Sequence, residues 1–164
     1  MNAGPQADEQ RSVVDVLIVN WNTGACLKRC LDSLFAFHPG LDIHVKVVDN
    51  ASSDGSTLAT GGLDRVRLIV NAENRGFAAA VNQALAEIRN ETTHVLVLNP
   101  DVEFRAVVLS PLLDYFETNP AAGIVTPRIE GPDGRIQATC RRREPSPGAV
   151  LAHLTGLARI FPNS

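Results

Sequence analysis

The chain has 164 residues, of which 45% are hydrophobic and 20% are charged, and its formal net charge is −3. This length allows one domain with a hydrophobic core. The charge excludes the strong basic excess of nucleic-acid-binding proteins, and no apolar run is long enough to span a bilayer. Residues 1–12 are polar and lack the apolar segment of a signal peptide, so we expect a disordered leader and a cytoplasmic protein.

Apolar, β-branched runs alternate with helical patterns through most of the chain. The sequence predicts strands over residues 13–19, 43–48, 66–70, 94–98 and, more briefly, 123–126. It predicts a helix over residues 23–37 with Thr23 as the cap, and a short helix capped by Ser52 or Ser53. Two further helices are predicted over 76–89 and 107–118. The helix over 76–89 is expected to bury a stripe formed by Phe77, Val81, Leu85 and Ile88. The alternation implies an α/β fold with a mainly parallel open sheet and helices on both faces.

The pattern changes after Pro127. Residues 131–134 have the composition of a β-hairpin turn between 128–130 and 135–137. The basic run 141–143 is more typical of a solvated face than of a phosphate site. A Pro-rich link leads to an apolar helical pattern over 149–161. We therefore expect a core domain over residues 13–143, followed over 144–164 by a linker and an apolar helix.

The chain contains three cysteines: Cys26, Cys30 and Cys140. An odd number without a secretory signal argues against a disulfide framework. Cys26 and Cys30 share a predicted helix face, and we expect them to pack as small hydrophobic side chains, because no neighbouring Cys or His completes a four-ligand metal set. The sequence also lacks the Gly-containing patterns of α/β-hydrolases, dinucleotide-binding turns and P-loops.

Polar residues follow four of the predicted strands at the point where each strand ends. These strand-end loops are residues 20–22, 49–54, 71–76 and 99–101. In an open α/β sheet the carboxyl ends of the strands form the edge at which ligands bind. Four polar loops at one such edge predict a site for a charged ligand.

Asp49 and Asn50 end the second predicted strand. A carboxylate or amide there could accept a hydrogen bond from the imide N–H of a pyrimidine or from a ribose hydroxyl, although a turn or helix cap also accounts for Asp49. Arg75 precedes a helix start, where backbone N–H groups attract anions, and Gly76 would let a ligand approach the backbone closely. Taken alone, that loop is more typical of an ordinary turn with a solvated arginine.

Asp101 follows the fourth predicted strand. Its carboxylate suits Mg²⁺ or Mn²⁺, which are hard cations that bridge phosphates. Asn99 supplies a second oxygen without a charge. The alternative is that both side chains cap the helix that follows.

Together these segments resemble the N-terminal half of a family 2 glycosyltransferase with the GT-A fold, a Rossmann-like nucleotide-sugar-binding fold. The matching segments, in family order, are VLIVNWN (16–22), VVDNASSDGS (47–56), NRGFAAAVN (74–82) and LVLNPD (96–101). The resemblance covers residues 13–143 and is closest to the rhamnosyltransferase-like branch, in which Asn-Pro-Asp stands in the place of Asp-x-Asp.

The resemblance implies roles for residues at the base end of a bound nucleotide. The loop after the first predicted strand, from Asn20 to Asn22, would lie against the base. Asp49 would hold the base or the ribose, with Asn50 beside it.

It also implies roles at the phosphate end. Arg75 and Asn82 would contact the nucleotide or brace its loop. Asp101 would bind Mg²⁺ or Mn²⁺ at the diphosphate, with Asn99 as a weaker neighbour.

The implied reaction is inverting transfer of a sugar from a dTDP- or UDP-sugar, usually rhamnose from dTDP-rhamnose, to a lipid-linked or polysaccharide acceptor in cell wall biogenesis. Such work suits the inner face of the plasma membrane, with peripheral membrane contact. The family takes its catalytic base from a downstream acidic pair, so we expect the base beyond residue 164. This chain would then be the donor-binding part, and residues 144–164 would begin the acceptor half.

Two alternatives remain at this point. The chain could be a non-catalytic nucleotide-sugar-binding or regulatory module. It could also be a flavodoxin- or receiver-like domain with Asp49 as phosphoacceptor, but that reading leaves residues 74–76 and the basic hairpin unexplained.

Overall fold

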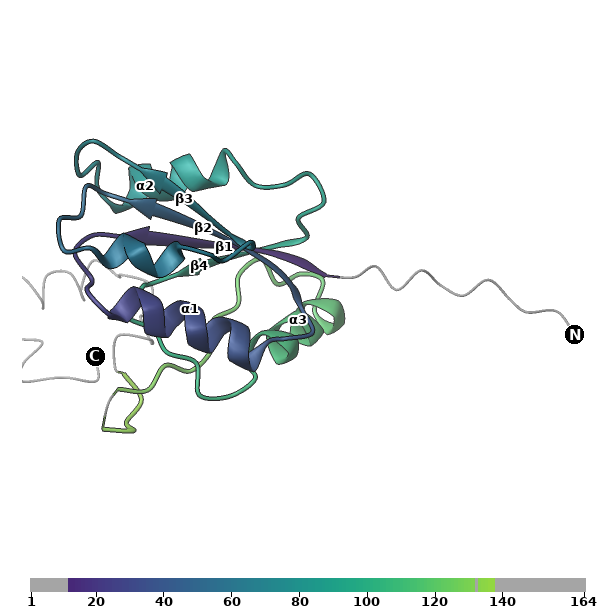
Figure 1. Cartoon of the computed structure of the whole chain (residues 1–164). Coiled ribbons are helices and arrows are strands. Elements are labelled where there is room, and N and C mark those ends of the chain that lie inside the picture. Colours follow the sequence, from purple (N-terminus) through teal and green to yellow (C-terminus); the bar gives the residue numbers. More distant parts are fainter. Residues whose placement is uncertain (1–11, 132, 138–164) are drawn as a thin grey trace, which may run out of the picture. The chain divides into compact units, whose positions relative to one another are not determined.

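The computed structural model describes residues 12–131 and 133–137, and the chain forms two compact units that divide after Gly123. The first unit contains, in chain order, β1 (Val13–Asn20), α1 (Cys26–Phe37), β2 (Asp42–Asp49), the 3₁₀ helix η1 (Ser56–Thr60), β3 (Val66–Val70), α2 (Phe77–Leu85), β4 (His94–Leu98) and α3 (Leu109–Thr118) (Figure 1). The leader over 1–11, Pro132, Cys140, the basic run 141–143 and the apolar pattern 149–161 lie outside the described residues.

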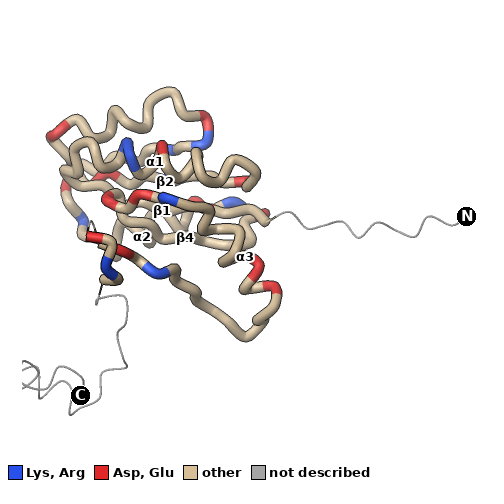
Figure 2. The backbone as a smooth tube through the Cα atoms, turned by 90° about the horizontal axis from the view of Figure 1, so that it is seen from below, with Lys and Arg blue, Asp and Glu red and all other residues tan. Residues whose placement is uncertain are grey.

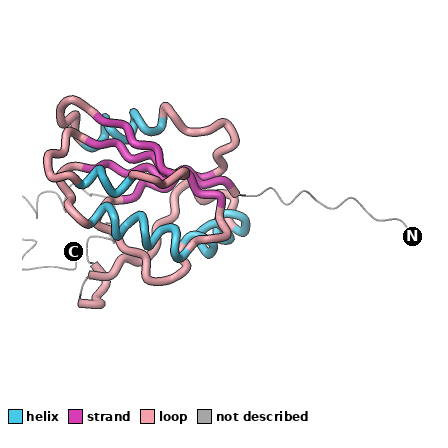
Figure 3. The backbone as a smooth tube through the Cα atoms, viewed as in Figure 1, coloured by secondary structure: helices cyan, strands magenta, loops and turns pink. Residues whose placement is uncertain are grey.

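The four described strands form one parallel sheet in the order β3-β2-β1-β4, with loops at both strand ends (Figure 3). β1 pairs with β2 on one side and with β4 on the other. β2 and β3 therefore lie on one side of β1, and β4 lies on the other. The point between β1 and β4, where the order of the strands switches sides, opens a crevice outside the strand carboxyl ends. The expected parallel α/β sheet is confirmed.

Helices cover both faces of the sheet, as expected (Figure 1). Because β1 side chains alternate in direction, Val16 and Ile18 pack with α1 and α3, whereas Leu17 packs with α2. The first of these clusters is the larger. It fully buries three leucines of α1, and each such burial contributes about 1.5–3 kcal/mol; they are Leu27, Leu31 and Leu34.

The stripe expected on α2 is wrong. Phe77 is 54% exposed and Leu85 is 37% exposed, and the helix ends before Ile88. Ala80 and Ala84 face the sheet instead, and Val81 packs beside them. Their small side chains let the helix lie close to the strands, which an assignment based on the largest apolar residues overlooks.

The expected caps of two helices are also wrong. Ala25 is the N-cap of α1, without a side-chain hydrogen bond, and the Thr23 hydroxyl donates to Asn20 Oδ1 at 2.5 Å. The helix after residue 53 is the short η1, which begins after Gly55 at a φ of 75°. Thr23 and Ser52 are bonded to polar side chains at the strand ends instead of capping a helix, and the Ser53 hydroxyl makes no hydrogen bond with any described residue.

His38 joins α1 to α3. Its Nδ1–H donates to the Leu34 carbonyl at 2.8 Å, and its Nε2 accepts the N–H groups of Val108 at 3.1 Å and Leu109 at 3.2 Å. The ring is buried and packs edge-on against Phe104. A distant imidazole thus caps α3, which begins at Leu109 rather than at residue 107 as expected.

A buried ion pair lies within the sheet. Asp15 of β1 accepts from Lys46 Nζ of β2 at 2.5 Å, and also from the Thr92 hydroxyl and the Arg89 N–H. Burial alone would raise the pKa of Asp15, but these hydrogen bonds outweigh it and hold the pKa below its ordinary value of 3.8.

The second unit contains the expected hairpin. Glu130 pairs with Ile136 in an antiparallel bridge, and the Gln137 N–H donates to the Ile129 carbonyl at 3.0 Å. The fifth strand expected over 123–126 is wrong, since these residues are not in a β-strand. The run is only three β-branched residues long, and Pro127, which follows, has no N–H to donate. None of the described helices has the length and apolar character needed to cross a membrane.

Candidate ligand-binding site at the carboxyl edge of the sheet

The register of the sheet brings the four strand-end loops to one edge, on the left in Figure 1. Asn20 pairs with Asp49, and Asp49 pairs with Val70. Leu98 pairs with Ile18, so the loop over 99–101 begins beside the end of β1. The sequence expectation that these loops share an edge is therefore confirmed.

Asn20 and Asp49 form the floor of this edge and are both buried. The Asn20 side-chain amide donates to Asp49 Oδ1 at 2.7 Å and to the Ser56 hydroxyl at 2.8 Å. The second Asp49 oxygen accepts the Ser52 N–H at 2.9 Å. Both carboxylate oxygens of Asp49 therefore accept hydrogen bonds from the protein itself. Because Asp49 is only 1% exposed, its carboxylate is also inaccessible to an incoming phosphoryl donor.

Ser52 connects the loop after β1 with the loop after β2. Its hydroxyl donates to Asp49 Oδ1 at 2.6 Å and accepts from the Asn22 N–H at 2.9 Å and from Asn20 Nδ2 at 3.1 Å. A serine hydroxyl has one donor and two acceptor positions, so all of its hydrogen-bonding capacity is used.

Two residues in these loops have left-handed backbones without being glycine. They are Asn22, with a φ of 50°, and Ala51, with a φ of 61°. For alanine this conformation costs about 1–2 kcal/mol. Strain of this kind persists where the surrounding contacts hold it, and it concentrates at ligand sites.

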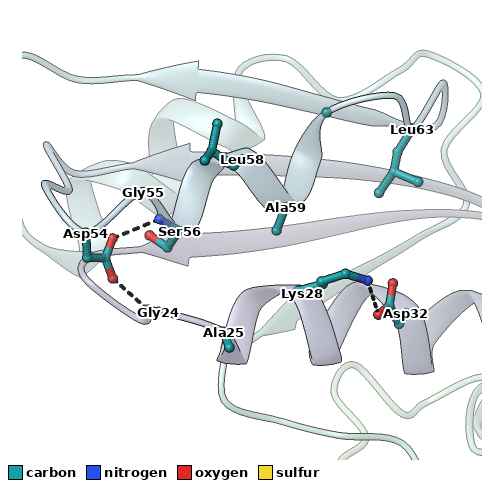
Figure 4. A pocket seen from close by; sticks show the side chains of 11 residues that line it. Gly24, Ala25, Lys28, Asp32, Asp54, Gly55, Ser56, Leu58, Ala59 and Leu63 are labelled. Carbon is teal, nitrogen blue, oxygen red and sulfur yellow. Dashed lines mark hydrogen bonds and ion pairs between the residues drawn. The ribbon is translucent and has the colours of Figure 1, made fainter.

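Asp54 links the loop after β1 to the loop after β2, and this pair of contacts is called the Asp54 clamp (Figure 4). Its carboxylate accepts the Gly24 N–H at 2.6 Å and the Ser56 N–H at 3.0 Å. Hydrogen bonds from Ser56 and from Gly24 hold the pKa of Asp54 below its ordinary value. The start of α1 and the start of η1 are thereby tied together.

The third loop is tied to the floor through Asn50. Asn50 is buried; its Oδ1 accepts from Asn71 Nδ2 at 3.0 Å, and its Nδ2 donates to the Gly76 carbonyl at 3.4 Å. Gly76 has a φ of 79°, and a Cβ there would meet open space. The backbone that leads into α2 is therefore fixed at the edge and open to an approaching ligand.

Other residues expected in the site are exposed. Arg75 and Asp101 have no hydrogen-bond or ion-pair partner among the described residues, and the same holds for the side chains of Asn82 and Asn99. Because acidic and basic residues are interspersed along the described backbone (Figure 2), recognition of a charged ligand depends on individual groups such as these.

Asp101 and Asn99 also have a buried neighbour. The Cys30 thiol of α1 lies 3.7 Å from the Asn99 carbonyl. Burial raises the pKa of Cys30 to about 12, and the nearby Asp101 charge adds to the effect. Cys30 is therefore a buried neutral thiol, as expected from the sequence, whereas Cys26 is only partly buried.

The donor set for a metal at this edge consists of oxygen atoms. Asp101 offers an unpaired exposed carboxylate, and Asn99 and Glu103 are exposed nearby in sequence. Within the described part of the chain, no three His, Cys, Asp or Glu side chains are arranged to hold a metal by themselves. These groups fit Mg²⁺ or Mn²⁺ shared with phosphate oxygens, because such ions often take only one or two protein carboxylates.

A cavity of about 510 Å³ lies between α1 and η1, on the outer side of the Asp54 clamp (Figure 4). Leu58, Ala59 and Leu63 line one wall, and the exposed Lys28–Asp32 ion pair lies on α1 opposite them. Asp49, Arg75 and Asp101 do not line this cavity.

Sequence reasoning assigned no individual site role to four residues of the edge, although all four lie in its strand-end loops or matching segments: Trp21, Ser52, Ser56 and Asn71. Trp21 is the only tryptophan in the sequence, and its side chain is 57% exposed between Asn20 and Asn22. An aromatic residue in a polar strand-end loop is a signal that the sequence alone contains. The hydrogen bonds of the other three depend on strand register, which their sequence positions do not reveal.

Comparison with known proteins identifies relatives of this chain. The family model described as Glycosyl transferase family 2 matches residues 15–156. An N-acetylglucosaminyl-diphospho-decaprenol L-rhamnosyltransferase of Mycobacterium tuberculosis is 31% identical over 140 residues, which cover 79% of this chain and 45% of the relative. A second strain has a relative with the same values. The chain thus spans less than half the length of these curated relatives.

Solved structures share the fold. A mannosyltransferase from Pyrobaculum calidifontis, in complex with GDP-Man and Mn²⁺, superimposes with a TM-score of 0.56 at 26% identity, over 65% of this chain and 32% of that one. TarS residues 1–349 of S. aureus, in complex with UDP-GlcNAc, superimposes with a TM-score of 0.59 at 18% identity, over 66% of this chain and 32% of that one.

Proposed function

The chain belongs to glycosyl transferase family 2, and from this premise we propose that its strand carboxyl edge binds the nucleotide-sugar donor of a glycosyltransferase. The observation that carries the proposal is the presence of Arg75 and Asp101, both exposed and unpartnered among the described residues, at the edge formed by the Asn20–Asp49 floor.

The phosphate end of the donor fits the charges at this edge. Arg75 offers a planar set of donors to phosphate oxygens just before the N-terminus of α2, where backbone N–H groups also favour an anion. Asp101 would repel a diphosphate by itself, so its place at this edge favours a divalent cation between the two. Asp101 would hold Mg²⁺ or Mn²⁺, with Asn99 beside it.

When bound, the cation would offset the negative charge that develops on the departing nucleoside diphosphate. The residues of the chain would contribute orientation. Arg75 and the start of α2 would fix the diphosphate, and Asn82, five residues into α2, would contact the nucleotide or brace its loop. Fixing the leaving group in this way lowers the entropic cost of the transfer step.

The base end of the donor fits the exposed indole of Trp21, which offers a stacking surface. Asn22 lies beside it and is also exposed. Asn20, Asp49 and Asn50 would shape the floor under the base and ribose. We therefore place a pyrimidine nucleotide, dTDP or UDP, with its base at Trp21 and its phosphates toward Arg75 and Asp101.

We propose rhamnose from dTDP-rhamnose as the sugar and a lipid-linked or polysaccharide acceptor, with inversion at the sugar carbon. The relative named as a rhamnosyltransferase that acts on a decaprenol-linked sugar supports this choice. We propose the inner face of the plasma membrane as the site of action, because it suits a lipid-linked acceptor. A non-catalytic donor-binding module would bind equally well and transfer nothing. A transfer assay with radiolabelled dTDP-rhamnose separates the two when it is run on the product of the full open reading frame, because we expect the catalytic base beyond residue 164.

Titration of the 164-residue chain with dTDP and with UDP, each with and without Mn²⁺, tests donor binding. Trp21 fluorescence reports the site without labelling because the chain has one tryptophan. We expect saturable, Mn²⁺-dependent binding, weakened roughly tenfold or more by Asp101→Asn and by Arg75→Met.

Asp64→Asn and Arg65→Met are matched controls. Both residues are exposed and directly precede β3, at the opposite edge of the sheet. They are expected to leave the dissociation constant unchanged. The proposed function would be refuted if the two control variants raised the dissociation constant as much as Asp101→Asn and Arg75→Met do. It would also be refuted if the unmodified chain bound neither nucleotide.

A further inference from the structure

We infer that Ser52 is a positioning residue, whose hydroxyl holds the Trp21–Asn22 segment in the conformation that receives the nucleotide base. This inference rests on the proposed function, because it assigns a role within the same donor site. Ser52 itself is half-buried and need not touch the ligand.

The contacts of Asn22 show what the hydroxyl does. The Asn22 N–H donates to Ser52 Oγ at 2.9 Å, and the Asn22 Oδ1 accepts the Ser53 N–H at 2.8 Å. Asn22 has a left-handed backbone, with a φ of 50°. The loop after β2 thus holds both the backbone and the side chain of Asn22, and the backbone contact depends on a single hydroxyl.

The other partners of Ser52 make that contact rigid. The hydroxyl proton is committed to Asp49 Oδ1 at 2.6 Å, so the oxygen lone pairs are directed at Asn20 Nδ2 and the Asn22 N–H. Asp49 is fixed in turn by Asn20 and by the Ser52 N–H. The buried floor therefore sets the direction of the Ser52 hydroxyl, and the hydroxyl sets the backbone next to Trp21.

Loss of the hydroxyl affects the Trp21 segment more than the floor. Without Ser52 Oγ, the Asn20 amide still donates to Asp49 and Ser56. The Asn22 N–H has no other acceptor among the described residues, and its strained backbone is free to relax. The exposed indole would then sample several positions, and ligand binding would have to restrict them again, which weakens affinity.

The chain supplies two matched serine-to-alanine controls. Ser33 lies on α1, where its buried hydroxyl donates to the Cys30 carbonyl and accepts the Phe104 N–H, so Ser33→Ala also removes buried hydrogen bonds but does so outside the network of Ser52. The Ser53 hydroxyl makes no hydrogen bond with any described residue, and Ser53→Ala keeps the backbone N–H that holds Asn22.

The test combines acrylamide quenching of Trp21 in the free chain with dTDP–Mn²⁺ titration, at a temperature where circular dichroism shows every variant folded. We expect Ser52→Ala to raise the quenching constant and to raise the dissociation constant about tenfold. Ser52→Thr, which restores the hydroxyl, should recover most of the affinity. Ser33→Ala and Ser53→Ala should match the unmodified chain in both measurements.

Unchanged quenching and affinity in Ser52→Ala would overturn the inference, as would equal losses in Ser52→Thr or in Ser33→Ala. Failure of the unmodified chain to bind dTDP–Mn²⁺ would instead overturn the proposed function. Quenching is measured without ligand, so the two failures are distinguishable.

Discussion

At the scale of single residues, the protein uses its buried polar groups in two different ways. Asn20, Asp49 and Ser52 bond to one another at the carboxyl edge and hold loops. Asp15 and Lys46 form an ion pair between β1 and β2, away from that edge, and Asp15 also accepts hydrogen bonds from the segment before β4. A buried pair of this kind gains little over an apolar pair, but removing one partner leaves an unpaired buried charge.

The lowered pKa of Asp15 predicts how stability changes with pH. A carboxyl with a lower pKa in the folded state stabilises the fold at pH values above its unfolded value of 3.8, and that contribution is lost as the pH falls through the folded value. Urea unfolding between pH 7 and pH 3 should therefore show a loss of stability below about pH 4.

Asp15→Asn should reduce this loss below pH 4 and should destabilise the chain at pH 7 by about 3–5 kcal/mol, because Lys46 is left unpaired. The double variant Asp15→Asn with Lys46→Met should recover much of the difference. A single variant as stable as the unmodified chain at pH 7 would contradict this role of the pair.

At the scale of the elements, the sequence predicted strands better than helix ends. The strand runs are continuous and β-branched, and each lies in the sheet where its pattern indicated, except for the three-residue run after Gly123. Helix ends depended on partners that are distant in sequence. Thr23 is bonded to Asn20 instead of capping α1, and α2 packs through Ala80 and Ala84, where small size matters more than hydrophobicity.

The start of α3 illustrates the same limit. No residue near Leu109 supplies a side-chain cap, and His38, about 70 residues earlier, accepts both N–H groups. His38→Ala should destabilise the chain by about 1–3 kcal/mol, measured by urea unfolding, because the buried Leu109 N–H and the partly buried Val108 N–H lose their acceptor.

His38→Gln keeps an acceptor on a side chain of similar length and should lose less stability than His38→Ala. Amide exchange of Val108 and Leu109 should accelerate in His38→Ala, whereas exchange in β1 should keep its protection until global unfolding. Uniform acceleration across both segments would show that His38 is not a specific cap for α3.

At the scale of the whole chain, the parallel sheet and its ligand-binding edge followed from the alternation of strands and helices and from the polar strand ends. The exposed groups Arg75 and Asp101 lie at that edge as the sequence indicated. The sequence could not reveal that Asp49 is enclosed, because its burial depends on Asn20 and Ser52 from adjacent loops. For the same reason the receiver-like alternative loses support, since a phosphoacceptor must be accessible.

Mn²⁺ broadening of backbone amide NMR signals tests the central claim most directly, because it reports where a donor nucleotide brings the cation. With dTDP present, signals should broaden in the loops over residues 20–24, 74–76 and 99–103, and residues 41–43 and 91–94 at the opposite edge should stay sharp. Asp101→Asn should abolish the broadening. Broadening at the opposite edge, or the same pattern without dTDP and in Asp101→Asn, would contradict a donor site built on Arg75 and Asp101.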